Sequence, residues 1–128
     1  MDKTISKIRK FLKERSWDKL MPSDVAKSIS IEAAELLEIF QWDNLSIDEV
    51  KKDKERMKKL EHEIADVLIY TLYLPILLDL DAEKLIAEKL KHNSKKFPVH
   101  LMKNRTSLSH TSKDIYIKIK KEYRKGKK

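Results

Sequence analysis

The sequence predicts an all-α protein, an antiparallel bundle of four to five helices that is completed by oligomerisation. The 128 residues contain one glycine and three prolines and are rich in lysine, glutamate, leucine and isoleucine, a composition that favours helices. Apolar residues also recur at helical spacing in several segments. A chain of this length forms a single core, and short helices with an exposed apolar face usually need a partner to cover it.

The first two helices are expected within residues 1–43. Residues 4–15 place their apolar side chains on one face, which predicts the first helix. A short connection ends at Pro22. Ser23 is the expected N-cap of the second helix, which runs to about Trp42.

A third helical stretch is expected to begin at a capping box, which Ser46 and Glu49 match. Residues 50–59 are dominated by charged side chains, so we expect this part to be exposed. The stretch becomes buried from Leu60 onward, and Pro75 is expected to kink it or loosen its end because proline lacks the N–H that a helix uses.

A further helix is expected to follow Asp81 and to end before Pro98, which disfavours helical backbone in the preceding residue. Beyond Met102 helical periodicity is weak. Apolar residues there alternate with polar ones, which is a strand-like period; they are Ile115, Ile117 and Ile119.

The net charge of +8 belongs to the C-terminal end of the chain. Residues 1–98 contain 19 basic and 19 acidic residues, whereas residues 99–128 contain ten Lys or Arg and two acidic residues. We therefore expect a domain at residues 1–104 and a basic tail at residues 105–128 that is flexible or ordered only by a partner. Binding of nucleic acid is an alternative function, open only through this tail.

Other classes of protein are excluded by composition. The chain has no cysteine, so disulfides and thiolate metal sites are impossible. The longest apolar run, residues 67–78, is 12 residues long and falls short of the roughly 20 needed to cross a membrane. The N-terminus lacks the apolar core of a secretory signal. We therefore expect a cytoplasmic protein with no membrane partner.

The candidate functional residues are carboxylates at i, i+3 spacing on two helices. At about 100° per residue, Glu32 falls within the apolar stripe of its helix and Glu35 lies at its edge. Glu63 and Asp66 repeat this spacing where the next long helix becomes apolar. An uncompensated buried carboxylate is costly, so we expect a cation there. Ligands that are all oxygen suggest Mg²⁺. A solvated helix face is the alternative interpretation of either pair.

These residues, together with neighbouring motifs, resemble the all-α nucleoside triphosphate pyrophosphohydrolases of the MazG type, and in particular the dCTP pyrophosphatase branch. The resemblance covers roughly residues 11–104. Besides the two carboxylate pairs, it rests on Glu14-Arg15-Ser16-Trp17-Asp18, Phe40-Gln41-Trp42, Asp66-Val67-Leu68-Ile69-Tyr70 and Phe97-Pro98-Val99.

The resemblance implies an enzyme that removes unwanted deoxynucleotides, such as dCTP-like nucleotides, from the precursor pool. Members hydrolyse a nucleotide between the α- and β-phosphates and release a monophosphate and pyrophosphate. The implied Mg²⁺ ligands are Glu32, Glu35, Glu63 and Asp66. Glu35, or alternatively Glu38, would orient or deprotonate the attacking water.

The resemblance also implies a substrate site. Trp17 and Trp42 resemble the aromatic pair that holds the base, and Tyr70 could hydrogen-bond the sugar or base. The triphosphate would be gripped by Lys89, Asn93 and Lys96. Packing in the core is the alternative role for the tryptophans and Tyr70, and a solvated face is the alternative for Lys96.

Two further expectations follow from the same resemblance. Members assemble as a homodimer or a dimer of dimers, with active sites built partly across the interface. Related sequences carry a histidine shortly after the first tryptophan, whereas this chain has Leu20-Met21-Pro22 there. Base and sugar specificity therefore stay open.

Overall fold

A computed structural model describes residues 1–102 and 110–126, with the side chains of those ranges except for residues 110–114. These residues form seven α-helices and one 3-10 helix and include no strand, which confirms the all-α prediction, with more helices than the expected four to five. Contacts divide the chain into two compact units, Met1–Ala82 and Glu83–Lys128. The expected functional boundary at residue 104 stays a prediction.

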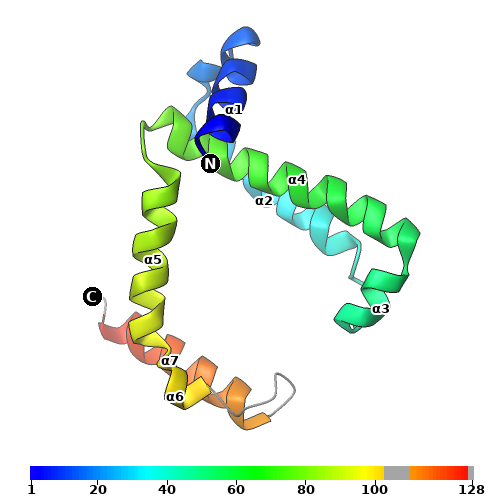
Figure 1. Cartoon of the computed structure of the whole chain (residues 1–128), viewed down its shortest axis with the longest axis vertical. Helices are drawn as coiled ribbons and strands as arrows, with labels where there is room; N and C mark the ends of the chain where they lie inside the picture. The colour runs from blue at the N-terminus through cyan, green and yellow to red at the C-terminus, as the bar shows by residue number, and fades with distance from the viewer. Residues whose placement is uncertain (103–109, 127–128) are drawn as a thin grey trace. The chain divides into compact units, whose positions relative to one another are not determined.

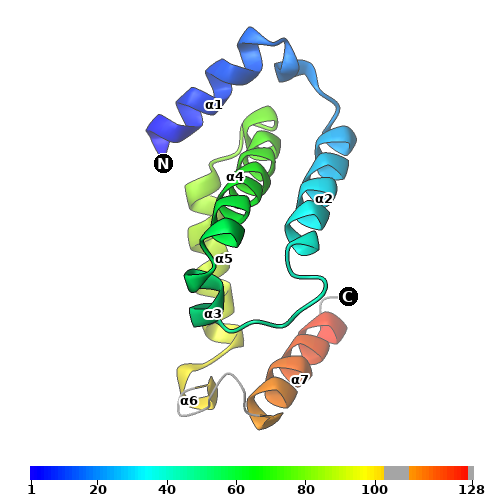
Figure 2. The ribbon, with the colours of Figure 1, turned by 90° about the vertical axis from the view of Figure 1, so that its right-hand side faces the viewer.

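Three helices form the framework of the first unit. They are α1 (Asp2–Glu14), α2 (Pro22–Glu38) and α4 (Lys54–Leu77), and α2 lies antiparallel along α4 (Figure 1). Figure 2 shows α1 across one end of this pair. A 3-10 helix, η1 (Trp17–Lys19), connects α1 to α2, and the short helix α3 (Ile47–Lys52) precedes α4.

Apolar side chains from these helices form one core. Leu12 of α1 and Val25 of α2 are almost fully buried, and they belong to one cluster with Ile8, Tyr73 and Ile76. This core joins α1 and the N-terminal part of α2 to the C-terminal half of α4. The core therefore fixes α2 against α4, the two helices that carry the four carboxylates.

The ends of α2 differ from the prediction. The helix begins at Pro22, and its N-cap is Met21 in extended backbone instead of Ser23. Proline suits the first helical position because its fixed φ matches the helix and its missing N–H is not needed there. α2 ends at Glu38, and a turn that includes Trp42 replaces the expected last helical residues.

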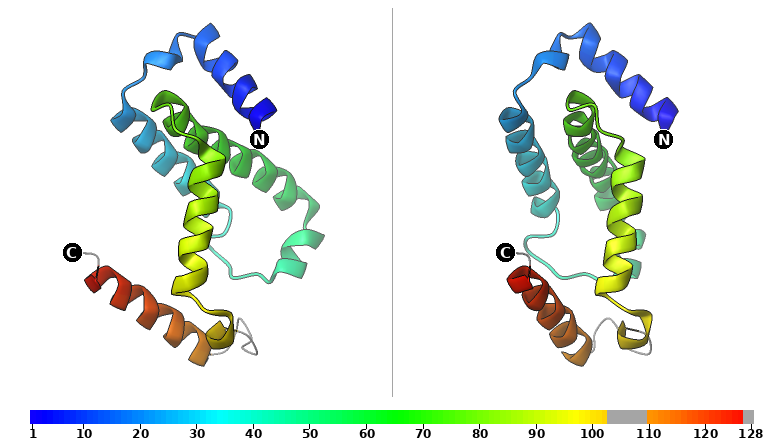
Figure 3. Two further views of the ribbon diagram at one scale, coloured as in Figure 1. Left: turned by 60° about the vertical axis from the view of Figure 1, so that its left-hand side comes forward. Right: turned by 90° about the vertical axis from the view of Figure 1, so that its left-hand side faces the viewer.

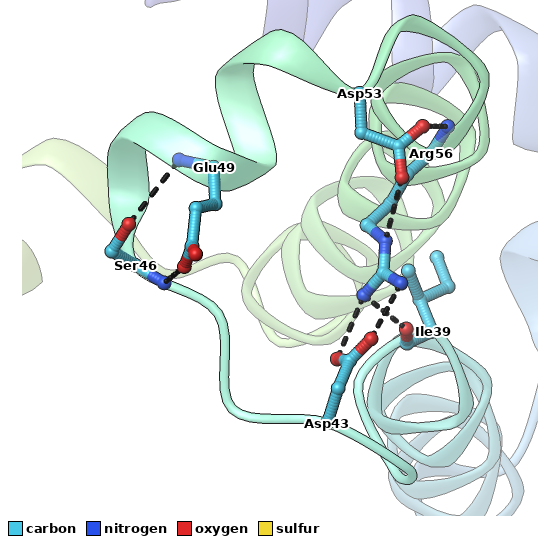
Figure 4. Close-up of polar contacts among 6 residues, drawn as sticks. All are labelled: Ile39, Asp43, Ser46, Glu49, Asp53 and Arg56. Atoms are coloured by element: carbon cyan, nitrogen blue, oxygen red, sulfur yellow. Dashed lines mark hydrogen bonds and ion pairs between the residues drawn. The ribbon is translucent and has the colours of Figure 1, made fainter.

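The capping box is confirmed (Figure 4). The Glu49 N–H donates to Ser46 Oγ at 3.2 Å, and the Ser46 N–H donates to Glu49 Oε2 at 2.7 Å. The helical stretch is nevertheless broken at Asp53, whose carboxylate accepts a hydrogen bond of 3.0 Å from the Arg56 N–H and so caps α4. Pro75 lies inside α4, close to its end.

The second unit contains most of α5 (Ala82–Lys96), then α6 (Val99–Met102) and α7 (His110–Gly126), as Figure 3 shows. α5 ends before Pro98, as predicted. Residues 103–109 and 127–128 lie outside the described residues, and these include residues 105–109 and 127–128 of the expected tail. No helix in the described ranges is long and apolar enough to cross a membrane.

The strand-like alternation expected over residues 115–119 is wrong, because this segment belongs to α7. Tyr116 stacks on Phe97 with ring centroids 5.2 Å apart, and Tyr123 lies edge-on to His92 at 5.7 Å. Tyr116 and Tyr123 are two helical turns apart and therefore share one face of α7. Aromatic packing at helical spacing thus outweighs a short run of alternating isoleucines.

Candidate active site

The two carboxylate pairs meet where α2 packs against α4. Carboxylate oxygens of Glu32, Glu63 and Asp66 all lie within 4.8 Å of one another. Glu32 and Glu63 are half-buried, and Asp66 is exposed. The i, i+3 spacing places both members of a pair on neighbouring positions of one helix face. The structure therefore brings together three of the four predicted metal ligands.

The fourth predicted ligand, Glu35, interacts with two of the other three. Burial raises the pKa of Glu32, and a hydrogen bond with Glu35 and repulsion by the other carboxylates raise it further. Burial also raises the pKa of Glu63, followed by repulsion from Glu35 and Asp66. Glu38 is exposed and adds a smaller repulsion to Glu63. Glu35 thus belongs to the cluster, and Glu38 lies at its margin.

The cation expected beside Glu32 is not a protein side chain in the described part of the chain, where no lysine or arginine forms an ion pair with Glu32 or Glu63 and their pKa values are raised by burial and neighbouring carboxylates. Glu63 Oε2 is buried without a hydrogen-bond partner there. Hard divalent cations take carboxylate oxygens as ligands and are neutralised by them. A cluster of carboxylates with one unpartnered buried oxygen therefore fits a site for a hard divalent cation.

An aromatic pocket of about 430 Å³ adjoins the cluster, because Asp66 lines both. Trp17 of η1 and Tyr70 of α4 form part of its wall, together with Lys7, Ile8, Phe11, Ile69 and Tyr73. Trp17 lies edge-on to Phe11 with ring centroids 5.8 Å apart, and Tyr70 lies 5.0 Å from Tyr73. Two of the predicted substrate residues, Trp17 and Tyr70, are therefore placed next to the carboxylates.

Trp42, the other predicted aromatic residue, does not line this pocket and is 89% exposed. Trp17 precedes α2 and Trp42 follows it, and a helix of 17 residues is about 25 Å long. The two indoles therefore lie toward opposite ends of α2. The expected sandwich of one base between them does not form within one chain.

The predicted phosphate-binding residues belong to the second unit. Lys89 and Asn93 lie one turn apart on α5, where Lys89 is exposed and Asn93 is half-buried. The Lys96 ammonium lies over two rings, 5.4 Å from the centroid of Phe97 and 4.9 Å from that of Tyr123. Binding of a triphosphate by these residues stays a prediction.

The sequence interpretation missed two parts of the site region. Arg56 lies in the charged stretch that we expected to be exposed, yet its side chain is only 19% exposed. Its one sequence signal is Asp53, three residues earlier, at the spacing of an ion pair on a helix. Phe11 and Tyr73 line the pocket, but helical periodicity marks them only as residues of an apolar face.

A sequence profile of the MazG-like family matches residues 27–124, more than half of the chain. This chain belongs to the MazG-like family. Its curated relatives include dCTP pyrophosphatase 1 of Rattus norvegicus, 33% identical over 94 residues, which are 71% of this chain and 55% of that protein. Human dCTP pyrophosphatase 1 is 30% identical over 97 residues, 73% of this chain and 56% of that protein. The MazG-like chain thus spans about half the length of these relatives.

A solved structure is similar as well. It is a pyrophosphatase from Archaeoglobus fulgidus, which matches with a TM-score of 0.68 and 40% identity over 77% of this chain and 92% of that one. The membership of the MazG type predicted from the sequence is therefore confirmed. The region matched by the family profile includes both carboxylate pairs and extends beyond residue 104 to residue 124.

Replacing Glu63 by glutamine is expected to weaken metal binding while stabilising the metal-free protein. Loss of an anionic ligand should lower the affinity for Mn²⁺ or Mg²⁺ by about 10- to 100-fold, the cost of disturbing even an outer partner of a metal site. Loss of a half-buried, repelled carboxylate should raise the midpoint of thermal unfolding in the presence of a chelator. Calorimetric titration and thermal unfolding measure the two effects.

Glu61→Gln is the matched control, because Glu61 is exposed on the same helix and lies outside the cluster. It should change neither quantity. Unchanged metal affinity in Glu63→Gln, or a loss of stability in its metal-free form, would contradict a metal site at this cluster.

Proposed function

We propose that this protein is a Mg²⁺-dependent nucleoside triphosphate pyrophosphohydrolase. It cleaves dCTP-like nucleotides between the α- and β-phosphates and releases a nucleoside monophosphate and pyrophosphate. The observation that carries the proposal is the convergence of Glu32, Glu63 and Asp66 within 4.8 Å in a MazG-like chain. Relatives named dCTP pyrophosphatase 1, and a similar structure named a pyrophosphatase, support this reaction class.

The magnesium would be held by Glu32, Glu63 and Asp66, with Glu35 beside them. A bound magnesium ion supplies positive charge opposite the triphosphate and the charge that develops on the leaving pyrophosphate. The half-buried position of Glu32 and Glu63 limits the water that competes for their oxygens.

Glu35 is the proposed general base. It is exposed while it contacts two half-buried members of the cluster, so a water beside it can reach a bound phosphate. The water oxygen would attack the α-phosphorus while Glu35 accepts a proton from the water. The α–β anhydride bond would break, and its electron pair would leave with the pyrophosphate. Glu38, the alternative base, is exposed one turn further along the chain.

The base would enter the aromatic pocket that Asp66 shares with the carboxylate cluster. Stacking on an aromatic ring such as Trp17 contributes about 1–3 kcal/mol and tolerates any base. The Tyr70 hydroxyl is a donor and acceptor for the sugar or the base edge. Lys89, Asn93 and Lys96 would contact the triphosphate, as the resemblance implies.

Assembly as a homodimer or a dimer of dimers is part of this proposal. Leu37 on α2 and Leu68 on α4 are 65% and 58% exposed, and Trp42 is 89% exposed. Large apolar side chains at such exposure are commonly covered by a partner subunit. Trp42 would then reach the site of another copy. Light scattering combined with activity measurement distinguishes an active dimer or tetramer from an active monomer.

A panel of canonical and modified ribo- and deoxynucleoside triphosphates with Mg²⁺ tests the proposed reaction. We expect release of pyrophosphate and the monophosphate, with deoxycytidine-type substrates among the best. Release of inorganic phosphate in place of pyrophosphate, or no hydrolysis of any member, would refute the reaction class.

Glu35→Gln is expected to lower kcat by about 100-fold or more, since loss of a general base typically costs 10²–10⁴-fold. Nucleotide binding should persist, because the aromatic pocket and the other three carboxylates remain. Pyrophosphate release gives kcat, and equilibrium titration of the nucleotide gives binding. Glu61→Gln again serves as the control, and full activity in Glu35→Gln would remove the assignment.

A second candidate function is binding of nucleic acid by α7. Its exposed basic side chains are Lys118, Lys121, Arg124 and Lys125. The helix packs within the second unit through Tyr116 and Tyr123, so its aromatic face is occupied and its exposed face is charged. Contacts with phosphates through such a face do not read sequence.

Replacing Lys118, Lys121 and Lys125 together by glutamine should weaken this binding. Each lost phosphate contact reduces the slope of log affinity against log salt by about 0.7–0.9, so three contacts remove roughly 2–3 from it. Fluorescence anisotropy of a labelled oligonucleotide measures the slope. The control replaces Lys51, Lys52 and Lys58, which are exposed in the first unit. Equal effects of the two triple variants would show only general charge attraction.

A further inference from the structure

Arg56 joins three segments that are distant from one another in the sequence (Figure 4). Its Nη1 donates to the Ile39 carbonyl at 3.0 Å and to Asp43 Oδ1 at 2.9 Å, and its Nη2 donates to Asp43 Oδ2 at 2.7 Å. Its Nε donates to Asp53 Oδ2 at 3.3 Å. The Arg56 side chain is only 19% exposed, and its bonds to Ile39 and Asp53 are partly buried, whereas those to Asp43 lie at the surface.

The acceptors of Arg56 bracket the turn that carries Trp42. Ile39 is the C-cap of α2, and its carbonyl is among those that a helix leaves without an internal partner. Asp43 is the residue directly after Trp42. Because one planar guanidinium binds both sides of this turn, the backbone of residues 39–43 is fixed to the first turn of α4.

Two further observations support this arrangement of the turn. Hydrogen bonds from Arg56 hold the pKa of Asp43 below its usual value, so the pair stays ionised to lower pH than an isolated aspartate would. The Arg56 guanidinium also lies 5.9 Å from the ring centroid of Phe40, inside the turn. The α3 segment does not compete for Arg56, since Ser46 and Glu49 satisfy its first turn by themselves.

Trp42 is nonetheless 89% exposed, so its own contacts cannot fix it. A tightly held backbone under an exposed indole is the arrangement expected where that indole is presented to a ligand. If the turn were mobile, the Trp42 side chain would sample many orientations. Ligand binding would then carry the entropic cost of ordering it.

We propose that Arg56 is a positioning residue for substrate binding, which holds Trp42 in the orientation that contacts the nucleobase. This inference rests on the proposed function for its ligand. Arg56 itself touches no substrate, because its donors are already engaged by Ile39, Asp43 and Asp53.

The test compares Arg56→Met, Arg56→Lys and the control Lys58→Met, an exposed lysine on the same helix. If Arg56→Met keeps the turn in its competent arrangement about a tenth of the time, KM for the nucleotide rises about tenfold while kcat changes little. Arg56→Lys keeps the charge but loses the planar fork, so it should restore only part of the affinity. Lys58→Met should match the wild type.

A second readout does not depend on activity. In a Trp17→Phe background Trp42 is the remaining one of two indoles, so its fluorescence reports on the turn alone. Its local anisotropy should fall in Arg56→Met, and the amides of residues 39–45 should exchange faster with solvent. Nucleotide titration of the wild type and Arg56→Met, both with Trp17 intact, gives the affinity directly.

The outcomes separate the two proposals. Unchanged Trp42 anisotropy and unchanged amide exchange in Arg56→Met would show that Arg56 does not hold the turn. A more mobile turn with an unchanged KM would show that substrate binding does not require an ordered turn. Either result overturns the inference. If the wild type releases no pyrophosphate, the proposed function fails, while fluorescence still tests the positioning. Should Arg56→Met not fold, Asp43→Ala removes only the bonds to Asp43 and is read in the same way.

Discussion

The central constraint on this fold is that four carboxylates must be held close together against their mutual repulsion. Glu32, Glu63 and Asp66 approach within 4.8 Å, and Glu35 interacts with two of them. Partial burial makes the ionised forms still less favourable, so the metal-free chain must hold these groups together against their charge. The α2–α4 pair achieves this because it is anchored on both sides of the cluster. A divalent cation relieves the repulsion, so the same packing that is costly without metal favours its binding.

The anchors at the two ends of the helix pair differ in chemistry. Toward the start of α2 the anchor is apolar, a core that includes Leu12, Val25 and Tyr73, and the aromatic pocket lies against it. Toward the end of α2 the anchor is polar, a single arginine with hydrogen bonds to three segments. Burial of apolar surface is non-directional, whereas the hydrogen bonds of a planar guanidinium fix direction. The carboxylates lie between a packed anchor and a directional one.

The sequence contained enough information for the cluster but not for its surroundings. Spacing alone placed Glu32, Glu63 and Asp66 on helix faces that could meet, because helical geometry is local. Ser46 and Glu49 were likewise readable as a capping box. The bonds of Arg56 to Ile39 and Asp43 depend on how α2 returns to α4, which no local pattern encodes.

The same distinction explains the error in α7. Ile115, Ile117 and Ile119 alternate with polar residues, but Tyr116 and Tyr123 find aromatic partners in the preceding segment of the same unit only when the chain is helical. The expected pairing of Trp17 with Trp42 was wrong within one chain for the same reason. Motifs that are close in the sequence do not show how far apart a helix between them places their side chains. Those two indoles mark opposite ends of α2, and the carboxylates lie between them. Two copies related by a two-fold axis, with their α2 helices antiparallel, would bring Trp42 of one toward Trp17 of the other. In the proposed dimer, the exposed indole on its held turn would be the part of the site that one chain supplies to the other.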